Sequence, residues 1–132
     1  MANVKTLMTP AAQIAPSLSQ ALNTAWALDT TADPAGWSTD NPAWGQCAVT
    51  ALVVQDLMGG QLLRCDCLAG SHYWNRLPDG AEFDLTRGQF RDGLIPRNVE
   101  ERDRRYVTSF PQTRQRYDTL RARVRAILSN EQ

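Results

Sequence analysis

The sequence has few histidines and cysteines and lacks a long apolar run, the features that would identify a metal-binding, disulfide-rich or membrane protein. It contains one histidine, three cysteines and no apolar run long enough to cross a bilayer. The cysteine count is odd, and Cys65 and Cys67 are too close along an extended strand to bridge each other easily, which argues against a disulfide scaffold. No signal-peptide pattern follows the N-terminal Met, so we expect a cytoplasmic protein with reduced thiols and no membrane association.

Long linkers and internal repeats are also lacking, which favours one domain over residues 1–132. Apolar residues make up 42% of the chain and charged residues 21%, as in ordinary globular proteins. Positive and negative charges balance, although most of the arginines lie between Arg87 and Arg125. Because acidic residues are interleaved with these arginines and no nucleic-acid motif accompanies them, we interpret the region as a solvated surface and expect no nucleic-acid partner.

Hydrophobic periodicity predicts helices near both ends of the chain. One helical pattern covers residues 16–28, and a second covers residues 45–58 and is stopped by Gly59 and Gly60. Apolar residues cover nearly all sides of the second helix, so we expect it to be buried at the centre of the domain. A further helix is expected over residues 112–128.

Between the last two helices the pattern indicates strands, which makes the expected fold class α+β. Residues 61–68 alternate as a strand. Two short runs, 71–77 and 81–86, flank a Pro-Asp-Gly sequence at 78–80 that is typical of a hairpin turn. Residues 87–110 follow no clear pattern.

Cys47 stands out because Gly45-Gln46-Cys47 lies where a loop meets the N-terminus of the buried helix. Free N–H groups and the helix dipole at this position favour a thiolate and lower the pKa of the cysteine. The same N–H groups can receive the oxyanion formed when a thiolate attacks a carbonyl. A structural helix start would more naturally use Ser, Thr, Asp or Asn. We therefore predict that Cys47 is a nucleophile rather than a small core residue.

His72 is the only imidazole in the chain and lies at the start of a strand after a flexible step, so it is the predicted base. The side chains that could orient its ring are Asp84, Glu82, Asn75 and Asp79. A three-residue hairpin loop pairs Trp74 with Asp84 and puts Asp84 on the face of His72, whereas a two-residue loop separates them. The turn sequence favours the three-residue loop, and hence Asp84, with Asp79 as a turn residue.

The Pro- and Trp-rich loop before the buried helix contributes further candidates. Gln46 and Asn41 are the predicted side chains that could help to bind an oxyanion. Trp44 and Trp74, together with Trp37, are predicted to wall the substrate cleft. Large side chains of this kind are costly to leave in a mobile connector, so we expect the loop to pack near the site.

Zinc binding is an alternative, since Cys65 and Cys67 could join Cys47 and His72 as four ligands. Two cysteines in Cys-x-Cys spacing on a strand hold their sulfurs about 7 Å apart, which is too far for one tetrahedral zinc unless the strand bends. We therefore interpret Cys65 and Cys67 as core residues opposite the buried helix, and expect no metal and no cofactor.

The chain also resembles a known group of proteins. Gly45-Gln46-Cys47 is similar to the Gly-Gln-Cys at the active site of transglutaminase-like proteins, in which cysteine, histidine and aspartate follow one another in that order. Residues 41–90, especially Gly-Ser-His-Tyr-Trp-Asn-Arg-Leu-Pro-Asp-Gly, resemble the bacterial YunG-like proteins. The resemblance implies a papain/transglutaminase-like core, in which a buried helix carrying Cys47 packs on a small antiparallel sheet between N- and C-terminal helices.

Together these features predict a cysteine-dependent hydrolase or acyl transferase that acts on an amide or thioester of a small-molecule or peptide substrate. Its expected triad is Cys47, His72 and Asp84. Two other functions remain open: a catalytically silent binding module of the same fold, and a small structural-zinc protein. The oligomeric state is not predicted.

Overall fold

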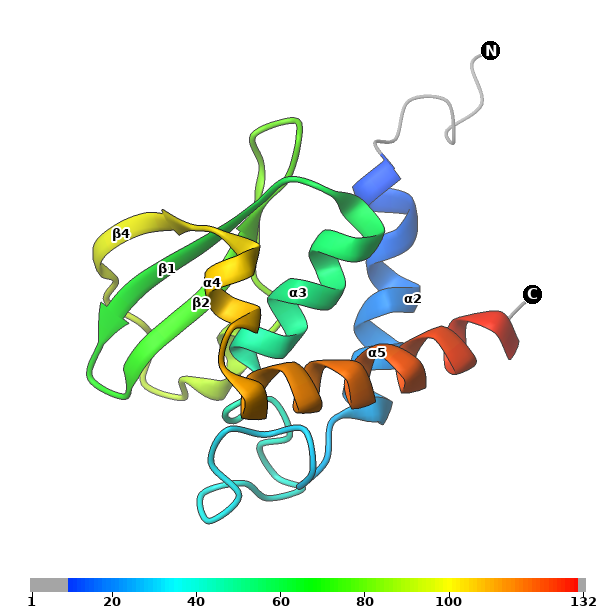
Figure 1. Ribbon diagram of the computed structural model, residues 1–132, viewed down its shortest axis with the longest axis horizontal. Helices are drawn as coiled ribbons and strands as arrows, with labels where there is room; N and C mark the ends of the chain where they lie inside the picture. Colours follow the sequence, from blue (N-terminus) through cyan, green and yellow to red (C-terminus); the bar gives the residue numbers. More distant parts are fainter. Residues whose placement is uncertain (1–9, 131–132) are drawn as a thin grey trace.

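The computed structural model describes residues 10–130. Two helices precede the sheet and two follow it (Figure 1). The elements in chain order are α2 (Pro10–Ala25), α3 (Cys47–Met58), β1 (Gln61–Cys67), β2 (Gly70–Arg76), β3 (Glu82–Phe83), the 3-10 turn η1 (Arg87–Gln89), β4 (Arg97–Arg102), α4 (Arg104–Thr108) and α5 (Pro111–Asn130). The predicted α+β class is therefore confirmed.

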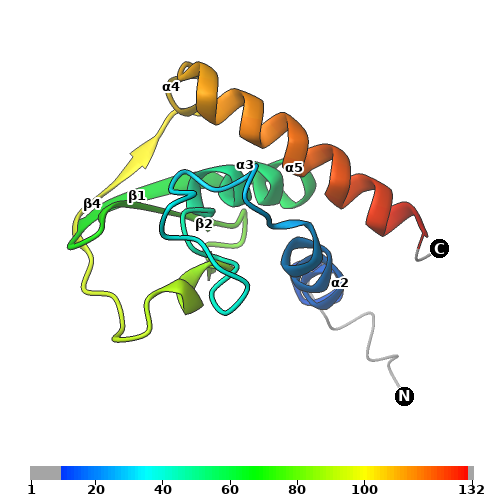
Figure 2. The same cartoon turned by 90° about the horizontal axis from the view of Figure 1, so that it is seen from below.

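The four strands form one antiparallel sheet in the order β3-β2-β1-β4. Helix α3 packs on β2, and α5 lies against α3 and α2 on the side away from the sheet (Figures 1 and 2). Among residues 10–130, no helix combines the length and the apolar character needed to cross a membrane.

Helix α3 is enclosed between the sheet and the other helices, as its sequence predicts. Every residue from Val49 to Val54 is buried. The helix ends at Gly59, whose φ of 75° lies in the left-handed region that glycine adopts without strain, and its N–H donates to the carbonyl of Gln55 at 2.9 Å. The buried centre of the domain is thus the helix that carries Cys47 at its first position.

Helix α2 differs from the prediction at both ends. It begins at Pro10 rather than at residue 16, because Pro10 takes the first helical position, where a missing N–H is tolerated, and Pro16 lies inside the helix. It ends at Ala25, so Leu28 falls beyond it and is 56% exposed. The apolar face that reaches the core runs from Leu18 to Ala25.

The segment without a clear pattern contains η1, β4 and α4. Strand β4 could not be read from its sequence because it is a charged edge strand, exposed along nearly all its length, so no apolar alternation marks it. Helix α5, in contrast, spans residues 111–130, close to the predicted 112–128, and buries Tyr117, Leu120 and Val124 at helical spacing.

The β2–β3 hairpin has the predicted three-residue loop. The Leu77 N–H donates to the Ala81 carbonyl at 2.8 Å, and the Gly80 N–H donates to the Leu77 carbonyl at 2.8 Å. Gly80 has a φ of 89°, which closes such a loop. β3 is shorter than predicted, but the register is the expected one, since Asn75 pairs with Phe83.

The two faces of the sheet carry different groups. Asn75 faces α3, since its Nδ2 donates to the Ala51 carbonyl at 2.9 Å. Leu63, Cys65 and Trp74 form a separate buried cluster on the opposite face. Because side chains alternate along a strand, His72 shares this second face with Trp74. The imidazole therefore lies on the side of the sheet away from the body of α3.

A polar network joins α3, α4 and α5 through one side chain from each helix. The Arg104 guanidinium donates to Asp56 Oδ1 at 2.7 Å and to the Tyr117 hydroxyl at 2.6 Å. That hydroxyl in turn donates to Asp56 Oδ2 at 2.5 Å. Bonds to charged groups in a partly buried setting are among the stronger hydrogen bonds, so this network fixes α4 and α5 against α3.

Tyr117→Phe removes the hydroxyl from this network while keeping the buried ring. We expect the free energy of unfolding to fall by about 1.5–3 kcal/mol, the usual contribution of a hydrogen bond to a charged group. Urea denaturation followed by circular dichroism measures it. Tyr106→Phe is the matched control, because Tyr106 is 49% exposed and removal of its hydroxyl should change the free energy of unfolding little. Equal effects of the two changes would contradict the role given to the network.

Candidate functional site

The loop before α3 is fixed by Gly45. Its φ is 71°, and a Cβ at this position would lie 2.2 Å from Thr31 Oγ1, so only glycine fits. The Thr31 hydroxyl donates to the Trp44 carbonyl at 2.6 Å, and the Ala32 N–H donates to the Gly45 carbonyl at 2.8 Å. The helix starts at Cys47, two residues later than predicted, because the positive φ of Gly45 is incompatible with a helical turn.

The Cys47 thiol lies against β2. Its Sγ is 4.0 Å from the Ser71 carbonyl oxygen, and the Tyr73 N–H also points toward it. Ser71 and Tyr73 flank His72 in the strand. Backbone N–H and C=O groups alternate in direction along a strand. Leu77, just after β2, donates its N–H to Ala81 on the β3 side, so Ser71 and Tyr73 direct their backbone groups to that same side. Since β3 is only two residues long, the thiol occupies the part of the β2 edge that β3 leaves open.

Cys47 is partly exposed as a residue, but its sulfur is enclosed by the surrounding atoms, and this burial raises the pKa of the thiol to about 11. The backbone N–H groups of Tyr73, Ala48 and Cys47 lower this pKa by less, and the negative charge of Asp84 raises it further. The expectation of a lowered pKa at the helix N-terminus is therefore wrong, because desolvation of the thiolate outweighs the N–H groups directed at it. At neutral pH the resting thiol is protonated, and it needs a base to become a nucleophile.

His72 is fully buried and holds Asp84 through one ring nitrogen. Its Nε2 lies 2.7 Å from Asp84 Oδ2. The ring stacks on Trp74 with 5.6 Å between ring centroids and makes a T-shaped contact with Phe90 at 4.8 Å. A carboxylate can only accept here, so in the neutral imidazole the proton is on Nε2 and the lone pair is on Nδ1. Within the described residues Nδ1 is buried without a hydrogen-bond partner, so it makes no hydrogen bond to the Cys47 thiol in this structure.

Asp84 is held from several sides. Its Oδ1 accepts hydrogen bonds from the Thr86 N–H at 3.3 Å and the Thr86 hydroxyl at 3.4 Å, and the Arg87 guanidinium lies 3.6 Å from Oδ2. The carboxylate side chain is only 12% exposed. These contacts fix the orientation of the oxygen that faces His72.

The other three candidates for orienting His72 have different partners. Glu82 accepts a hydrogen bond from Trp74 Nε1 at 2.6 Å. Asp79 accepts from the Ala81 N–H at 2.9 Å inside the turn, as predicted. Asn75 bonds to α3 on the opposite face of the sheet. Of the four candidates, the structure brings only Asp84 to the imidazole.

Sequence reasoning missed Gln89, which connects the segments that carry Cys47 and Asp84. Its Oε1 accepts from the Gly45 N–H at 3.2 Å, and its Nε2 donates to the Thr86 carbonyl at 3.0 Å. Its own carbonyl accepts from Asn41 Nδ2 at 3.1 Å. Gln89 is only 6% exposed, but it lies in the segment without a pattern, and no signal in the sequence singles it out.

The two predicted oxyanion donors are engaged elsewhere in this structure. Gln46 is fully buried, and its Nε2 donates to the Ala27 carbonyl at 3.2 Å, while its Oε1 has no partner among the described residues. The amide of Asn41 is bonded to Gln89. Either side chain would have to release its present acceptor to reach an oxyanion, whereas the backbone N–H groups at the start of α3 are already free of intrahelical acceptors.

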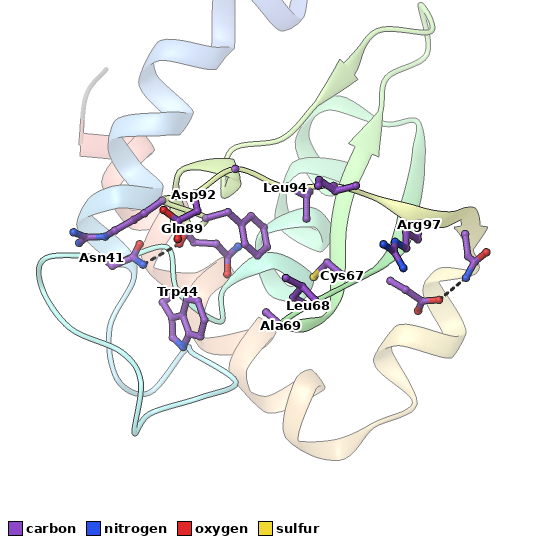
Figure 3. Close-up of a pocket in the computed structure, with 15 residues that line it drawn as sticks. Asn41, Trp44, Cys67, Leu68, Ala69, Gln89, Asp92, Leu94 and Arg97 are labelled. Atoms are coloured by element: carbon purple, nitrogen blue, oxygen red, sulfur yellow. Dashed lines mark hydrogen bonds between the residues drawn. The ribbon is translucent and has the colours of Figure 1, made fainter.

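A pocket of about 790 Å³ adjoins this cluster (Figure 3). Asn41 and Trp44 line one side of it, and Phe90, whose ring contacts His72, lines it as well. Of the three predicted tryptophans only Trp44 takes part. Trp74 is buried beside His72, and Trp37, whose Nε1 donates to the Pro42 carbonyl, does not line the pocket.

The other two thiols are separated in the fold. Cys65 is buried with Leu63 and Trp74, on the sheet face away from α3, and burial raises its pKa. Cys67 is partly exposed and lines the pocket. In the part of the chain from residue 10 to residue 130, no group of three or more His, Cys, Asp or Glu side chains is arranged to hold a metal ion.

The fold and the site define a small α+β protein in which a cysteine at a helix N-terminus contacts the strand that carries a buried histidine paired with an aspartate. The family model described as YunG protein matches residues 15–129, so the chain belongs to the YunG family. It is 36% identical over 69 residues to "Uncharacterized protein YunG" of Bacillus subtilis (strain 168), a match that covers 49% of this chain and 59% of that relative. No solved structure matches the chain.

The raised pKa of Cys47 predicts its response to a simple alkylating agent. The rate of Cys47 modification by iodoacetamide should keep rising with pH up to about 11, because only the thiolate reacts. Peptide mapping by mass spectrometry at each pH measures the rate at Cys47 and at Cys67 separately. A Cys47 rate that has already levelled off near neutral pH would show that the thiolate forms in the resting protein.

Proposed function

We propose that the protein is a cysteine-dependent hydrolase or acyl transferase that acts on an amide or thioester. Cys47 is the nucleophile, His72 the general base and Asp84 the group that orients the imidazole. The observation that supports this most is the state of His72: one nitrogen is held by a carboxylate at 2.7 Å, and the other is buried with no hydrogen-bond partner among the described residues. The thiol contacts the backbone of Ser71 and Tyr73, the two residues that flank His72 in the strand. A buried nitrogen without a hydrogen-bond partner lowers the stability of the fold, and a catalytic role explains why it is kept.

The raised pKa of Cys47 determines the order of the steps. The neutral thiol gives its proton to His72 Nδ1 as its sulfur attacks the substrate carbonyl, so that charge develops only during the reaction. For this transfer the sulfur has to move into hydrogen-bond contact with Nδ1. The imidazolium that forms is stabilised by Asp84, which is the role of the carboxylate in a serine or cysteine triad.

The N-terminus of α3 completes the mechanism. The negative oxygen of the tetrahedral intermediate would be received by backbone N–H groups in the first turn of the helix. When the intermediate collapses, His72 returns its proton to the leaving amine or thiol, and an acyl group stays on the Cys47 sulfur. Water or an acceptor amine, deprotonated by His72, then releases the acyl group.

This arrangement is the reason to propose a papain/transglutaminase-like core. A helix that starts with the nucleophilic cysteine and packs on antiparallel strands carrying histidine and aspartate, in that chain order, is what the Gly-Gln-Cys resemblance implies. The chemistry needs a reduced thiol, so we assign the protein to the cytoplasm.

A catalytically silent binding module is the second candidate. It is favoured by the protonated Cys47 thiol and by the lack of a hydrogen bond from Nδ1 to any described residue. The two candidates differ in one respect: only the enzyme accepts an acyl group on Cys47 at a rate that depends on His72 and Asp84.

The Asp84→Asn variant separates the candidates. Incubation with p-nitrophenyl acetate should give a burst of p-nitrophenolate and an acetyl group on Cys47, detected by mass spectrometry. Asp84→Asn should slow this acylation by about 10²–10⁴-fold, because the imidazole loses its orienting charge. Thermal unfolding checks that the variant keeps its fold.

Glu82→Gln is the matched control. Glu82 is a neighbouring carboxylate that bonds to the Trp74 ring N–H instead of the imidazole. Its replacement should leave the acylation rate of Cys47 unchanged. If Cys47 is not acylated above the rate of a free thiol, or if both variants react like the wild-type protein, the protein is a binding module and not this enzyme.

A further inference from the structure

The pocket lies next to the candidate site. Phe90 lines the pocket and its ring also packs edge-on against His72, with 4.8 Å between ring centroids. Trp44 lines it three residues before Cys47. Asp66 lines it and pairs in the sheet with Ser71, whose carbonyl contacts the thiol. Cys47, His72 and Asp84 do not themselves line the pocket, so a ligand held in it would have to extend past Phe90 and Trp44 to reach the sulfur.

The pocket suits a mainly apolar group. Its volume of about 790 Å³ falls in the range of small-molecule sites. Between Trp44 and Arg97 the labelled side chains are Cys67, Leu68, Ala69 and Leu94, which are small or apolar (Figure 3). Leu68 is fully exposed and Ile95 is 79% exposed, an unusual degree of exposure for apolar side chains gathered at one opening.

The charges in the pocket favour an anion. Arg91 donates to the Asp40 carbonyl and Arg97 also lines the pocket, but no ion pair of either arginine is seen among the described residues. On the acidic side, Asp66 is paired with Arg64 at 2.8 Å and bonded to Asn98 at 2.9 Å. Asp92 is the other acidic residue of the lining. The two arginines and Asp92 form no ion pair among the described residues, so they leave one net positive charge in the lining. Arg97 lies at the end of the pocket away from Trp44 (Figure 3).

We infer that this pocket binds the acyl part of the substrate, an apolar group that carries an anionic group at its far end. The inference rests on the proposed function, since it assigns Cys47 to the carbonyl end of the ligand. Trp44 and Phe90 contact the part of the ligand nearest the carbonyl, the apolar side chains cover its body, and Arg97 pairs with its anion. Such a substrate is an acidic acyl compound or the acidic end of a peptide.

Two dyes test the pocket without any reaction at Cys47. Anilinonaphthalene sulfonate has apolar rings and an anion, and phenylnaphthylamine has the same rings without the anion. Fluorescence titration of the full chain should show tighter binding of the sulfonate dye. Saturating dye should also slow the modification of Cys67 by iodoacetamide, because this partly exposed thiol lies in the pocket wall.

Three variants locate the binding. Arg97→Gln should raise the dissociation constant of the sulfonate dye about fivefold and leave that of the neutral dye unchanged, as expected for the loss of one accessible ion pair. Leu94→Gln should weaken the binding of both dyes, because it replaces an apolar side chain of the pocket wall with a polar one. Val99→Gln is the control, because Val99 is 49% exposed on β4 outside the pocket, and it should change neither.

The inference is overturned if Arg97→Gln does not weaken binding of the sulfonate dye, or if saturating dye does not slow the modification of Cys67 by iodoacetamide. The outcome is distinguishable from failure of the proposed function, because dye binding needs neither His72 nor Asp84. If the dyes behave as expected and Cys47 is never acylated, the pocket belongs to a binding module for the same class of anion. If Cys47 is acylated but the dyes bind elsewhere, the enzyme takes its acyl group by another surface.

Discussion

The contact between His72 Nε2 and Asp84 Oδ2 is the interaction on which the rest of the site depends. It exists because the three-residue turn at Pro78–Gly80 sets the register of the β2–β3 hairpin and brings both side chains to one face. Because the carboxylate accepts the Nε2 proton, the basic nitrogen of the imidazole is Nδ1. A hairpin shifted by one residue would turn Asp84 to the other face and leave the imidazole without this partner.

A second constraint is the shortness of β3. A longer strand would pair with the whole edge of β2 and cover the backbone groups of Ser71 and Tyr73. Since pairing stops after two residues, the N-terminus of α3 can place the Cys47 sulfur at that edge. The same enclosure desolvates the thiol and keeps it protonated. In our proposal the site therefore generates its thiolate only when the imidazole takes the proton, in the manner of a serine hydrolase.

Much of this arrangement could be predicted from the sequence because it depends on local rules. A helix with apolar residues on nearly all sides predicted a buried α3, Gly59 predicted its end, and Pro-Asp-Gly predicted the turn between the strand of His72 and the segment of Asp84. The parts that could not be predicted depend on tertiary contacts. Gln89 is an ordinary polar residue until the fold places it between Gly45 and Thr86. The pKa of Cys47 was predicted in the wrong direction because helix position is visible in the sequence and burial of the sulfur is not.

The chain has a single histidine, so nitrogen NMR of the histidine-labelled protein reports on His72 alone. This measurement tests the central claim most directly, which is that Asp84 fixes the tautomer of the imidazole. The account predicts that the neutral imidazole carries its proton on Nε2 and leaves Nδ1 bare, with this preference lost in Asp84→Asn. A proton on Nδ1, or the averaged signal of a freely exchanging imidazole, would contradict it.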